Sequence, residues 1–393
     1  MTGMLSIWTI EGYSSKSMTP GGFALPKFLL FFLIAYPAMA GVTIVSPEKG
    51  AYLSGEFEII LNIEGQAKMT RLFIDGKMVF QIEGKIERFT YDFGEDILRR
   101  EIRAEIDDAS GQTISSDLLF TRALSIDYTD TTRLVLLGAV VKTRSGKPVL
   151  GLTQDKFKIF ENDKPLQIQS FYSESLPLDL VILLDTSSSL RNGGIDDVKR
   201  GAIAFISKLA PGDRVALFEF KKKPHKLADF TTDRVRLTQL IQNMEPLGET
   251  ALFNALHLGL DHLKERRKGR KALLLFTDGR DSFYDDPRDK ARMMRNGIIM
   301  AQNREVTIFT LGLGKDVHKA ALTRIAEDTG GRFYAADRPS RLSATFNEIL
   351  SDLKHQYMLG VTPKAKGRGF QKIEIKVKKR GVVVHARKGY TLE

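Results

Sequence analysis

The sequence predicts an α/β protein with a doubly wound, mostly parallel sheet, preceded by a β-rich region. Three observations predict this fold class. After residue 178, short apolar runs alternate with stretches of helical period. The run at 178–184 is apolar almost throughout, which is typical of a strand buried on both faces. Before residue 178, strand-like runs follow one another and are separated by turn residues.

The elements of the α/β region come in the order expected for a doubly wound sheet. Apolar runs predict strands at 178–184, 215–218, 272–276 and 306–311. Apolar residues at helical spacing predict helices at 198–209, 234–244, 251–263, 289–303, 318–328 and 341–354. We therefore place an α/β domain at residues 179–355.

Residues 41–125 are predicted to form a small β domain. Strand-like runs at 42–45 and 57–63 flank a turn sequence, and Asp75-Gly76 is a hairpin signal. Strands at this spacing are typical of a sandwich. The segment resembles bacterial immunoglobulin-like modules, in which a Ser-Pro turn precedes a strand and a later strand ends in Asp-Gly.

Two further segments flank the α/β domain and are also predicted to be β-rich. Residues 126–178 form a lead-in, with apolar and polar residues alternating at 157–160 and 168–171. Residues 356–393 form a C-terminal β extension, because residues 373–377 alternate in the same way.

The N-terminal segment predicts export. Residues 28–36 form a short apolar run that follows Lys27 and ends near the small residues Ala38 and Ala40. This pattern predicts a signal peptide at residues 1–40 that is cleaved after Ala40, with Met18 as an alternative start. The mature protein would then be periplasmic, bound to the cell envelope or secreted. A buried strand or an uncleaved anchor is the alternative interpretation.

Composition and charge exclude some functions. The 393 residues include no cysteine, so disulfides, zinc–thiolate sites and thiol nucleophiles are excluded. The net charge of +11 is concentrated in residues 354–393, which hold eleven basic and two acidic residues. Such a basic tail attracts acidic partners or an anionic envelope surface. No nucleic-acid-binding motif accompanies the charge, so nucleic acid is not an expected partner.

Oxygen-bearing side chains follow two predicted strands and precede one predicted helix. Asp185, Ser187 and Ser189 follow the first strand, Asp278 follows a later strand, and Thr250 opens a helix between them. Ligands of doubly wound sheets bind at the carboxyl ends of the strands. Oxygen ligands without nitrogen or sulfur suit Mg²⁺, Mn²⁺ or Ca²⁺. Taken singly, each residue is also explained as a helix cap or a turn residue.

Together these five positions match the metal-ion-dependent adhesion site of von Willebrand factor type A (VWA) domains. The resemblance implies that Ser187, Ser189 and Thr250 coordinate the ion directly, while Asp185 and Asp278 anchor and orient it. A wider similarity to bacterial VWFA-related exported proteins covers residues 130–393. Two positions depart from the common pattern, namely Leu190 and Glu249. Neither departure removes an expected ligand, and the carboxylate of Glu249 is a candidate to tune the site.

The expected function is protein binding and adhesion. Two carboxylates and three neutral hydroxyls under-neutralise a divalent ion, so a Glu or Asp of a partner protein would complete its coordination. We therefore expect a binding module and not an enzyme.

Two alternatives remain at this point. A metal-dependent hydrolase or phosphatase would use Asp185 as nucleophile, although the second aspartate of the usual Asp-x-Asp pair is replaced by Ser187. An envelope scaffold with a structural metal is the other alternative. The Gly-x-Ser-x-Gly elbow of serine hydrolases and the P-loop of NTPases are both absent from the sequence.

Overall fold

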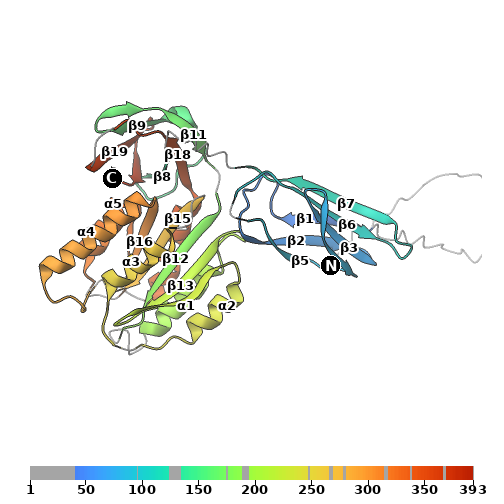
Figure 1. Cartoon of the computed structure of the whole chain (residues 1–393), viewed down its shortest axis with the longest axis horizontal. Coiled ribbons are helices and arrows are strands. Elements are labelled where there is room, and N and C mark those ends of the chain that lie inside the picture. The colour runs from blue at the N-terminus through green and yellow to red at the C-terminus, as the bar shows by residue number, and fades with distance from the viewer. Residues whose placement is uncertain are drawn as a thin grey trace, which may run out of the picture. The chain divides into compact units, whose positions relative to one another are not determined.

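The computed structural model describes residues 40–94, 96–123, 134–173, 176–187, 194–246, 248–264, 269–277, 280–313, 317–336, 339–365 and 369–392. The predicted signal peptide, apart from Ala40 itself, lies outside these residues. Figure 1 shows the elements in chain order.

The first β region is built from two antiparallel sheets. One sheet has the order β1-β2-β5, with β1 at Gly41–Ser46, β2 at Glu56–Glu64 and β5 at Arg88–Asp92. The other has the order β4-β3-β6-β7, with β3 at Met69–Ile74, β4 at Lys77–Glu83, β6 at Glu101–Asp107 and β7 at Thr113–Phe120. The predicted β-rich module before the α/β domain is therefore confirmed, while its immunoglobulin likeness stays a prediction.

Local sequence explains two features of this region. Along β2, Phe57, Ile59 and Leu61 are buried in a shared core, because alternate side chains of a strand face one side of the sheet. Between β3 and β4, Asp75 and Gly76 have φ values of 50° and 76°. Positive φ at both central residues is the geometry of a tight hairpin, as the Asp-Gly pair predicts.

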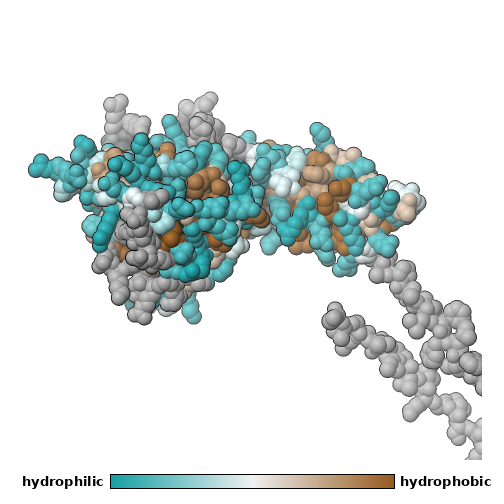
Figure 2. Space-filling view, turned by 90° about the horizontal axis from the view of Figure 1, so that it is seen from below, coloured by the Kyte–Doolittle hydropathy of each residue, from teal (hydrophilic) through white to brown (hydrophobic). Residues whose placement is uncertain are grey.

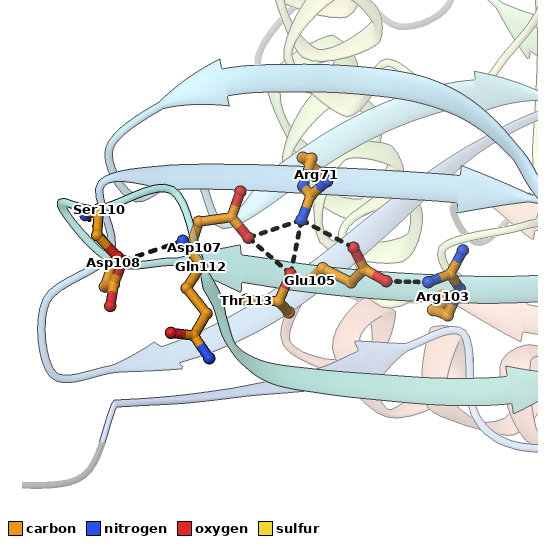
Figure 3. A network of polar contacts seen from close by, with 8 residues as sticks. All are labelled: Arg71, Arg103, Glu105, Asp107, Asp108, Ser110, Gln112 and Thr113. Carbon is orange, nitrogen blue, oxygen red and sulfur yellow. Dashed lines mark hydrogen bonds and ion pairs between the residues drawn. The ribbon is translucent and has the colours of Figure 1, made fainter.

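A polar network ties β3, β6 and β7 together (Figure 3). The guanidinium of Arg71 lies 2.7 Å from Asp107 and 3.1 Å from Glu105, and it donates a hydrogen bond to Thr113. Arg103 pairs with the other oxygen of Glu105. Because these residues come from three neighbouring strands, the network stabilises their register.

The second β region combines two segments that are far apart in the sequence. One sheet has the order β11-β18-β8-β20, with β8 at Val135–Thr143, β11 at Ile168–Tyr172, β18 at Gln356–Val361 and β20 at Val382–Ala386. The other has the order β10-β9-β19-β21, with β9 at Phe157–Glu161, β10 at Lys164–Leu166, β19 at Gly369–Val377 and β21 at Gly389–Leu392. Their inner faces share one core, so the lead-in and the C-terminal extension fold together.

The central sheet has the order β14-β13-β12-β15-β16-β17, and all its strands are parallel except β14. The strands are β12 at Leu178–Asp185, β13 at Arg214–Phe220, β14 at Pro224–Thr231, β15 at Arg270–Thr277, β16 at Val306–Leu313 and β17 at Phe333–Ala336. The predicted fold class is confirmed. The sequence did not indicate β14, which is an edge strand with a single buried residue, or β17, which has four residues.

Helices cover both faces of this sheet (Figure 1). On one face lie α1 at Gly194–Ile206, α2 at Arg234–Gln242 and α6 at Pro339–Lys354. On the other lie α3 at Leu252–His262, α4 at Pro287–Asn303 and α5 at Lys319–Asp328. Leu180 and Ile182 of β12 face the first core and Val181 the second, which explains the continuous apolar run. None of the helices in the described part of the chain has the length and apolar composition needed to span a membrane.

Candidate functional site

The topological switch point of the central sheet lies between β12 and β15. From β12 the chain passes to β13 on one side, and it later returns to β15 on the other side of β12. The two strands are parallel, and Leu184 is paired with Phe276. Asp185 and Thr277 therefore end neighbouring strands at the same edge of the sheet, where doubly wound proteins bind their ligands.

Asp185 is fully buried at this edge. One carboxylate oxygen accepts a hydrogen bond from the backbone amide of Ser187 at 2.9 Å, and the other accepts one from the hydroxyl of Thr277 at 2.7 Å. The bond to Ser187 closes an Asx-type turn directly after the strand. Ser187 is itself 2% exposed, so the two described ligands of this segment are held in the interior.

Thr250 lies in the loop before α3 and is also buried. Its amide donates to the hydroxyl of Ser282 at 2.7 Å, and the amide of Ser282 donates to the carbonyl of Thr250 at 2.9 Å. The next amide, of Ala251, donates to the carbonyl of Lys221 at 2.8 Å. Backbone hydrogen bonds on both sides thus fix the position of Thr250.

Asp281 supports the same loop from the side of α3. One of its carboxylate oxygens accepts from the amide of Phe253 in the first turn of the helix, at 3.2 Å. The other accepts from the amides of Phe283 and Tyr284, at 3.1 and 3.0 Å. A carboxylate at this end of a helix is favourable, because it satisfies free amides and faces the positive end of the helix dipole.

The structure links three of the loops that carry the predicted ligands. Thr277 contacts Asp185 and Ser282 contacts Thr250, so the residues on either side of Asp278 touch both other loops. Ser189 and Asp278 lie outside the described residues, and the five-residue ligand set stays a prediction.

Three supporting residues were not singled out from the sequence, namely Thr277, Asp281 and Ser282. Thr277 had a usable signal, because it ends a predicted strand directly beside Asp278. Asp281 and Ser282 had none, because the helix and loop that they hold begin about thirty residues earlier in the chain.

The donor set fits a hard divalent cation. Asp185 contributes a buried carboxylate, and Ser187 and Thr250 contribute hydroxyl oxygens, which are the ligand types of Mg²⁺, Mn²⁺ and Ca²⁺. The described residues contain no cluster of three or more His, Asp and Glu side chains placed to hold a metal. Glu249 is exposed and lies 3.8 Å from Lys222, so the described contact of this extra carboxylate is an ion pair at the surface.

Comparison with known families agrees with this geometry. Residues 179–348 match the family described as von Willebrand factor type A domain. This segment of the chain is a VWA domain. The matched residues run from the start of β12 into α6, so they include the whole switch point and every predicted metal ligand. VWA domains are metal-dependent modules for adhesion and protein interaction.

Two curated relatives match part of this chain. The chain is 25% identical over 187 residues to the uncharacterized protein sll0103 of Synechocystis sp., covering 47% of this chain and 43% of that protein. It is 29% identical over 157 residues to the minor fimbrium subunit Mfa5 of Porphyromonas gingivalis, covering 35% of this chain and 13% of the subunit. The alignments thus span less than half the length of these relatives.

Among solved structures, a von Willebrand factor type A protein from Catenulispora acidiphila is 13% identical. The alignment covers 66% of this chain and 74% of that protein, with a TM-score of 0.42.

Proposed function

We propose that the VWA domain binds one divalent cation, Mg²⁺ or else Mn²⁺ or Ca²⁺, and uses it to capture a Glu or Asp of a partner protein. The proposed ligands are Asp185, Ser187, Ser189, Thr250 and Asp278. The observation that supports the proposal is that the loops of Asp185 and Thr250, both buried residues, are held at the same strand end: the amide of Thr186 donates to Phe220 and the amide of Ala251 donates to Lys221.

The described ligands supply one negative charge to the site, that of Asp185. Ser187 and Thr250 are neutral, and Asp185 shares its two oxygens with the Ser187 amide and the Thr277 hydroxyl. With Asp278 the proposed ligands balance the formal charge of a divalent cation, but three of the five are neutral hydroxyls and the cation would keep an open coordination position. A carboxylate from a partner fills that position with a charged oxygen, whereas water fills it without adding charge. The buried surroundings strengthen that attraction, because charges interact more strongly away from water.

A cleft of about 690 Å³ lies beside the loop that holds Thr250, and it is lined by Asp281, Ser282 and residues of α3, α4 and α5. Its basic groups are Arg280, Lys290 and His318. Its acidic groups are Asp281, which accepts three backbone amides, and Asp285. The two carboxylates offset the charges of Arg280 and Lys290, so the cleft offers room for a partner segment and no net positive charge.

The burial of Asp185 bears on the enzyme alternative. A phosphatase nucleophile has to reach the phosphorus of its substrate, but this carboxylate is 0% exposed and both its oxygens accept hydrogen bonds. This favours a binding module over a hydrolase. A purely structural metal remains an outcome of the experiment below.

We also propose that the protein is exported. The short apolar segment and the Ala-x-Ala pattern that ends at Ala40 support this. The similarity to a fimbrial subunit, Mfa5, points in the same direction.

The basic C-terminal segment is proposed to steer acidic partners or anionic envelope surfaces toward the protein. Part of its charge is already paired, since Lys376 lies 3.3 Å from Glu374 and Lys388 lies 2.7 Å from Asp328. Other lysines, such as Lys378 and Lys379, would attract acidic groups at longer range. Salt screens this attraction over about 8 Å at physiological ionic strength.

The test is capture of partner proteins from an envelope extract with and without EDTA, using wild type, Thr250→Ala and Thr307→Ala. Thr307 is a matched control, because it is the second residue of β16 and lies at the amino end of the strands of the same sheet. We expect wild type and Thr307→Ala to capture the same acidic partner in Mg²⁺ and to release it in EDTA. Thr250→Ala should fold but capture nothing. Equal capture by Thr250→Ala in both conditions would show that partners dock elsewhere and that any metal is structural.

A further inference from the structure

One face of the second β region brings together lysines from two distant segments of the chain. In the sheet β10-β9-β19-β21, Lys376 of β19 is paired directly with Lys158 of β9. Next to this pair, the amide of Lys378 donates to the carbonyl of Lys156 at 2.7 Å. All four lysines are exposed, while the residues that alternate with them face the core. We call the surface formed by these four side chains the lysine face.

The lysine face is unfavourable for the sheet by itself, because like charges directly opposite each other on neighbouring strands are destabilising. Two acidic side chains offset part of the charge. Asp155 lies 2.9 Å from Lys156, and Glu374 lies 3.3 Å from Lys376. Both ion pairs are largely exposed, and ion pairs of this kind contribute little. The face therefore keeps positive charge that an anionic surface can neutralise.

The turns at the same end of this region add further cations. The turn at residues 378–381 joins β19 to β20, and its Gly381 carbonyl accepts the amide of Arg144, which follows β8, at 3.2 Å. Residues 143–165 and 370–382 together hold ten basic and four acidic residues, a net charge of +6. More than half of the net charge of the chain is thus carried by two short segments that meet in the folded structure.

Aromatic side chains accompany the cations on this face. The ammonium of Lys376 lies 5.0 Å from the ring centroid of Phe160 on β9. Phe370 lies on the same side of β19 as Lys376, because the two are six residues apart along the strand, and it is 53% exposed. Charge alone would suit any anion. An exposed phenylalanine beside the cations favours the surface of a lipid bilayer, where headgroups attract the lysines and the apolar ring enters the acyl boundary.

The first β region has exposed apolar side chains without this charge. Hydrophobic residues reach its surface (Figure 2), among them Met78 and Leu118, each 46% exposed. Its residues 41–123, however, hold ten basic and fifteen acidic residues, a net charge of −5. Anionic headgroups repel such a region, so the charge assigns lipid contact to the second β region.

The lysine face points away from the VWA domain. The other sheet of the second β region contacts the amino end of the central sheet, where Gln356 of β18 donates to Thr307 of β16 at 3.4 Å. Arg387, which follows β20, donates to the carbonyl of Gln302 in α4 at 2.8 Å. The sheet with the lysines packs on the opposite side of that contacting sheet. A bilayer at the lysine face would therefore leave the carboxyl end of the central strands open to a partner.

We propose that the second β region docks on an anionic lipid bilayer through the lysine face and Phe370. This docking extends the proposed steering role of the basic C-terminal segment, and it adds the lysines of the lead-in to it. It does not depend on the metal site.

The test is cosedimentation of the mature protein, from residue 41, with vesicles in EDTA. The vesicles contain phosphatidylcholine alone or with about one-third phosphatidylglycerol. Wild type should bind only the anionic vesicles. The variant Lys158→Gln/Lys376→Gln should bind them about 30-fold more weakly, because each cation near an anionic surface contributes roughly fivefold. The control Lys49→Gln/Lys85→Gln removes the same charge from exposed positions of the first β region and should bind as wild type does.

A second variant separates a lipid surface from a soluble polyanion. Phe370→Ser should weaken vesicle binding about tenfold and leave binding to soluble polyglutamate unchanged, because only a bilayer offers an apolar region to the ring.

Three results would overturn the proposal. The first is wild-type protein that binds anionic vesicles no better than neutral ones. The second is equal vesicle binding by the lysine variant and its control. The third is binding to polyglutamate without binding to vesicles, which would assign the face to an acidic polymer. Any of these results together with metal-dependent capture of a partner would leave the proposed metal site standing.

Discussion

The two ends of β12 each carry a buried aspartate, but the surroundings of the two carboxylates differ. At the amino end, Asp179 accepts two hydrogen bonds from Arg214, at 2.9 and 3.2 Å. At the carboxyl end, Asp185 accepts from the neutral amide of Ser187 and the neutral hydroxyl of Thr277. A carboxylate that faces a fixed arginine stabilises the fold, whereas the amide and hydroxyl contacts of Asp185 are compatible with the proposed cation site.

Other carboxylates at the amino end of the sheet also face cations. Asp213 lies 3.9 Å from the buried Arg270. Burial raises the pKa of Asp213, and the nearby guanidinium of Arg270 opposes that shift. Asp352 of α6 pairs with Lys142 of β8. The comparison teaches that one sheet places structural ion pairs at the amino end of its strands and the proposed binding site at the carboxyl end.

The largest expected effect is a loss of stability when an ion pair at the amino end of the central sheet is removed. Asp352→Ala leaves the buried Lys142 without its counter-ion and removes the acceptor of the Tyr334 hydroxyl, at 2.6 Å. We expect unfolding in denaturant to show a loss of about 3–5 kcal/mol. Lys142→Met should cost less, because Asp352 keeps Tyr334 and Arg332 as partners. A loss below about 1 kcal/mol for Asp352→Ala would mean that this end does not depend on ion pairs.

A smaller effect, on Mn²⁺ affinity, is expected from removing a hydrogen bond at the carboxyl end of the central sheet. Ser282→Ala removes the hydroxyl that accepts the amide of Thr250. Because residues that position metal ligands typically contribute one to two orders of magnitude, Mn²⁺ affinity should fall about 10–100-fold by calorimetry. Ser115→Ala removes a comparable hydroxyl from the amide of Val42, far from the site in sequence, and should leave Mn²⁺ affinity unchanged. Equal affinities for both variants would exclude Ser282 from organising the site.

The smallest expected effect is a pH dependence of folding stability that arises from His385, near the ion pairs at the amino end of the central sheet. Burial lowers the pKa of His385, and Arg332 and Lys142 lower it further, while Asp352 and Glu327 oppose the shift. The unfolded chain therefore binds a proton more readily than the folded protein below about pH 6.5. Stability from the neutral imidazole is complete above that pH and is lost as the pH falls toward the lower folded pKa.

His385→Gln isolates this contribution. Thermal unfolding between pH 7.5 and 5.5 should show a weaker decline for the variant than for wild type. Identical declines would assign the pH dependence to other groups, among them His257, whose pKa burial also lowers.

The central sheet could be predicted from sequence because its pattern is local. The continuous apolar run of β12 and the helical periods of α1–α6 lie within single stretches of chain, and all six helices appear within four residues of the expected bounds. The strand β14 was missed because its exposed face weakens the apolar signal. The pairing of β8 with β18 was missed because partners about 200 residues apart leave no local pattern.

The residues of the candidate site also differ in whether their own sequence neighbourhood predicts them. Asp185, Ser187 and Thr250 were named because oxygen-bearing side chains at strand ends have a known use. Asp281 and Ser282 accept hydrogen bonds from backbone amides about thirty residues earlier in the chain. Only the folded structure shows these contacts.

The central claim is that the two buried aspartates of β12 have different roles, and one comparison tests it directly. Calorimetric titration of Mn²⁺ into wild type, Asp185→Asn and Asp179→Asn, with denaturant unfolding of each in EDTA, measures both roles in isosteric variants. We predict that Asp185→Asn loses Mn²⁺ binding and keeps its stability. Asp179→Asn should bind Mn²⁺ as wild type does and lose about 2–3 kcal/mol of stability, because Arg214 loses its counter-ion. Mn²⁺ binding by Asp185→Asn with wild-type affinity would contradict the account.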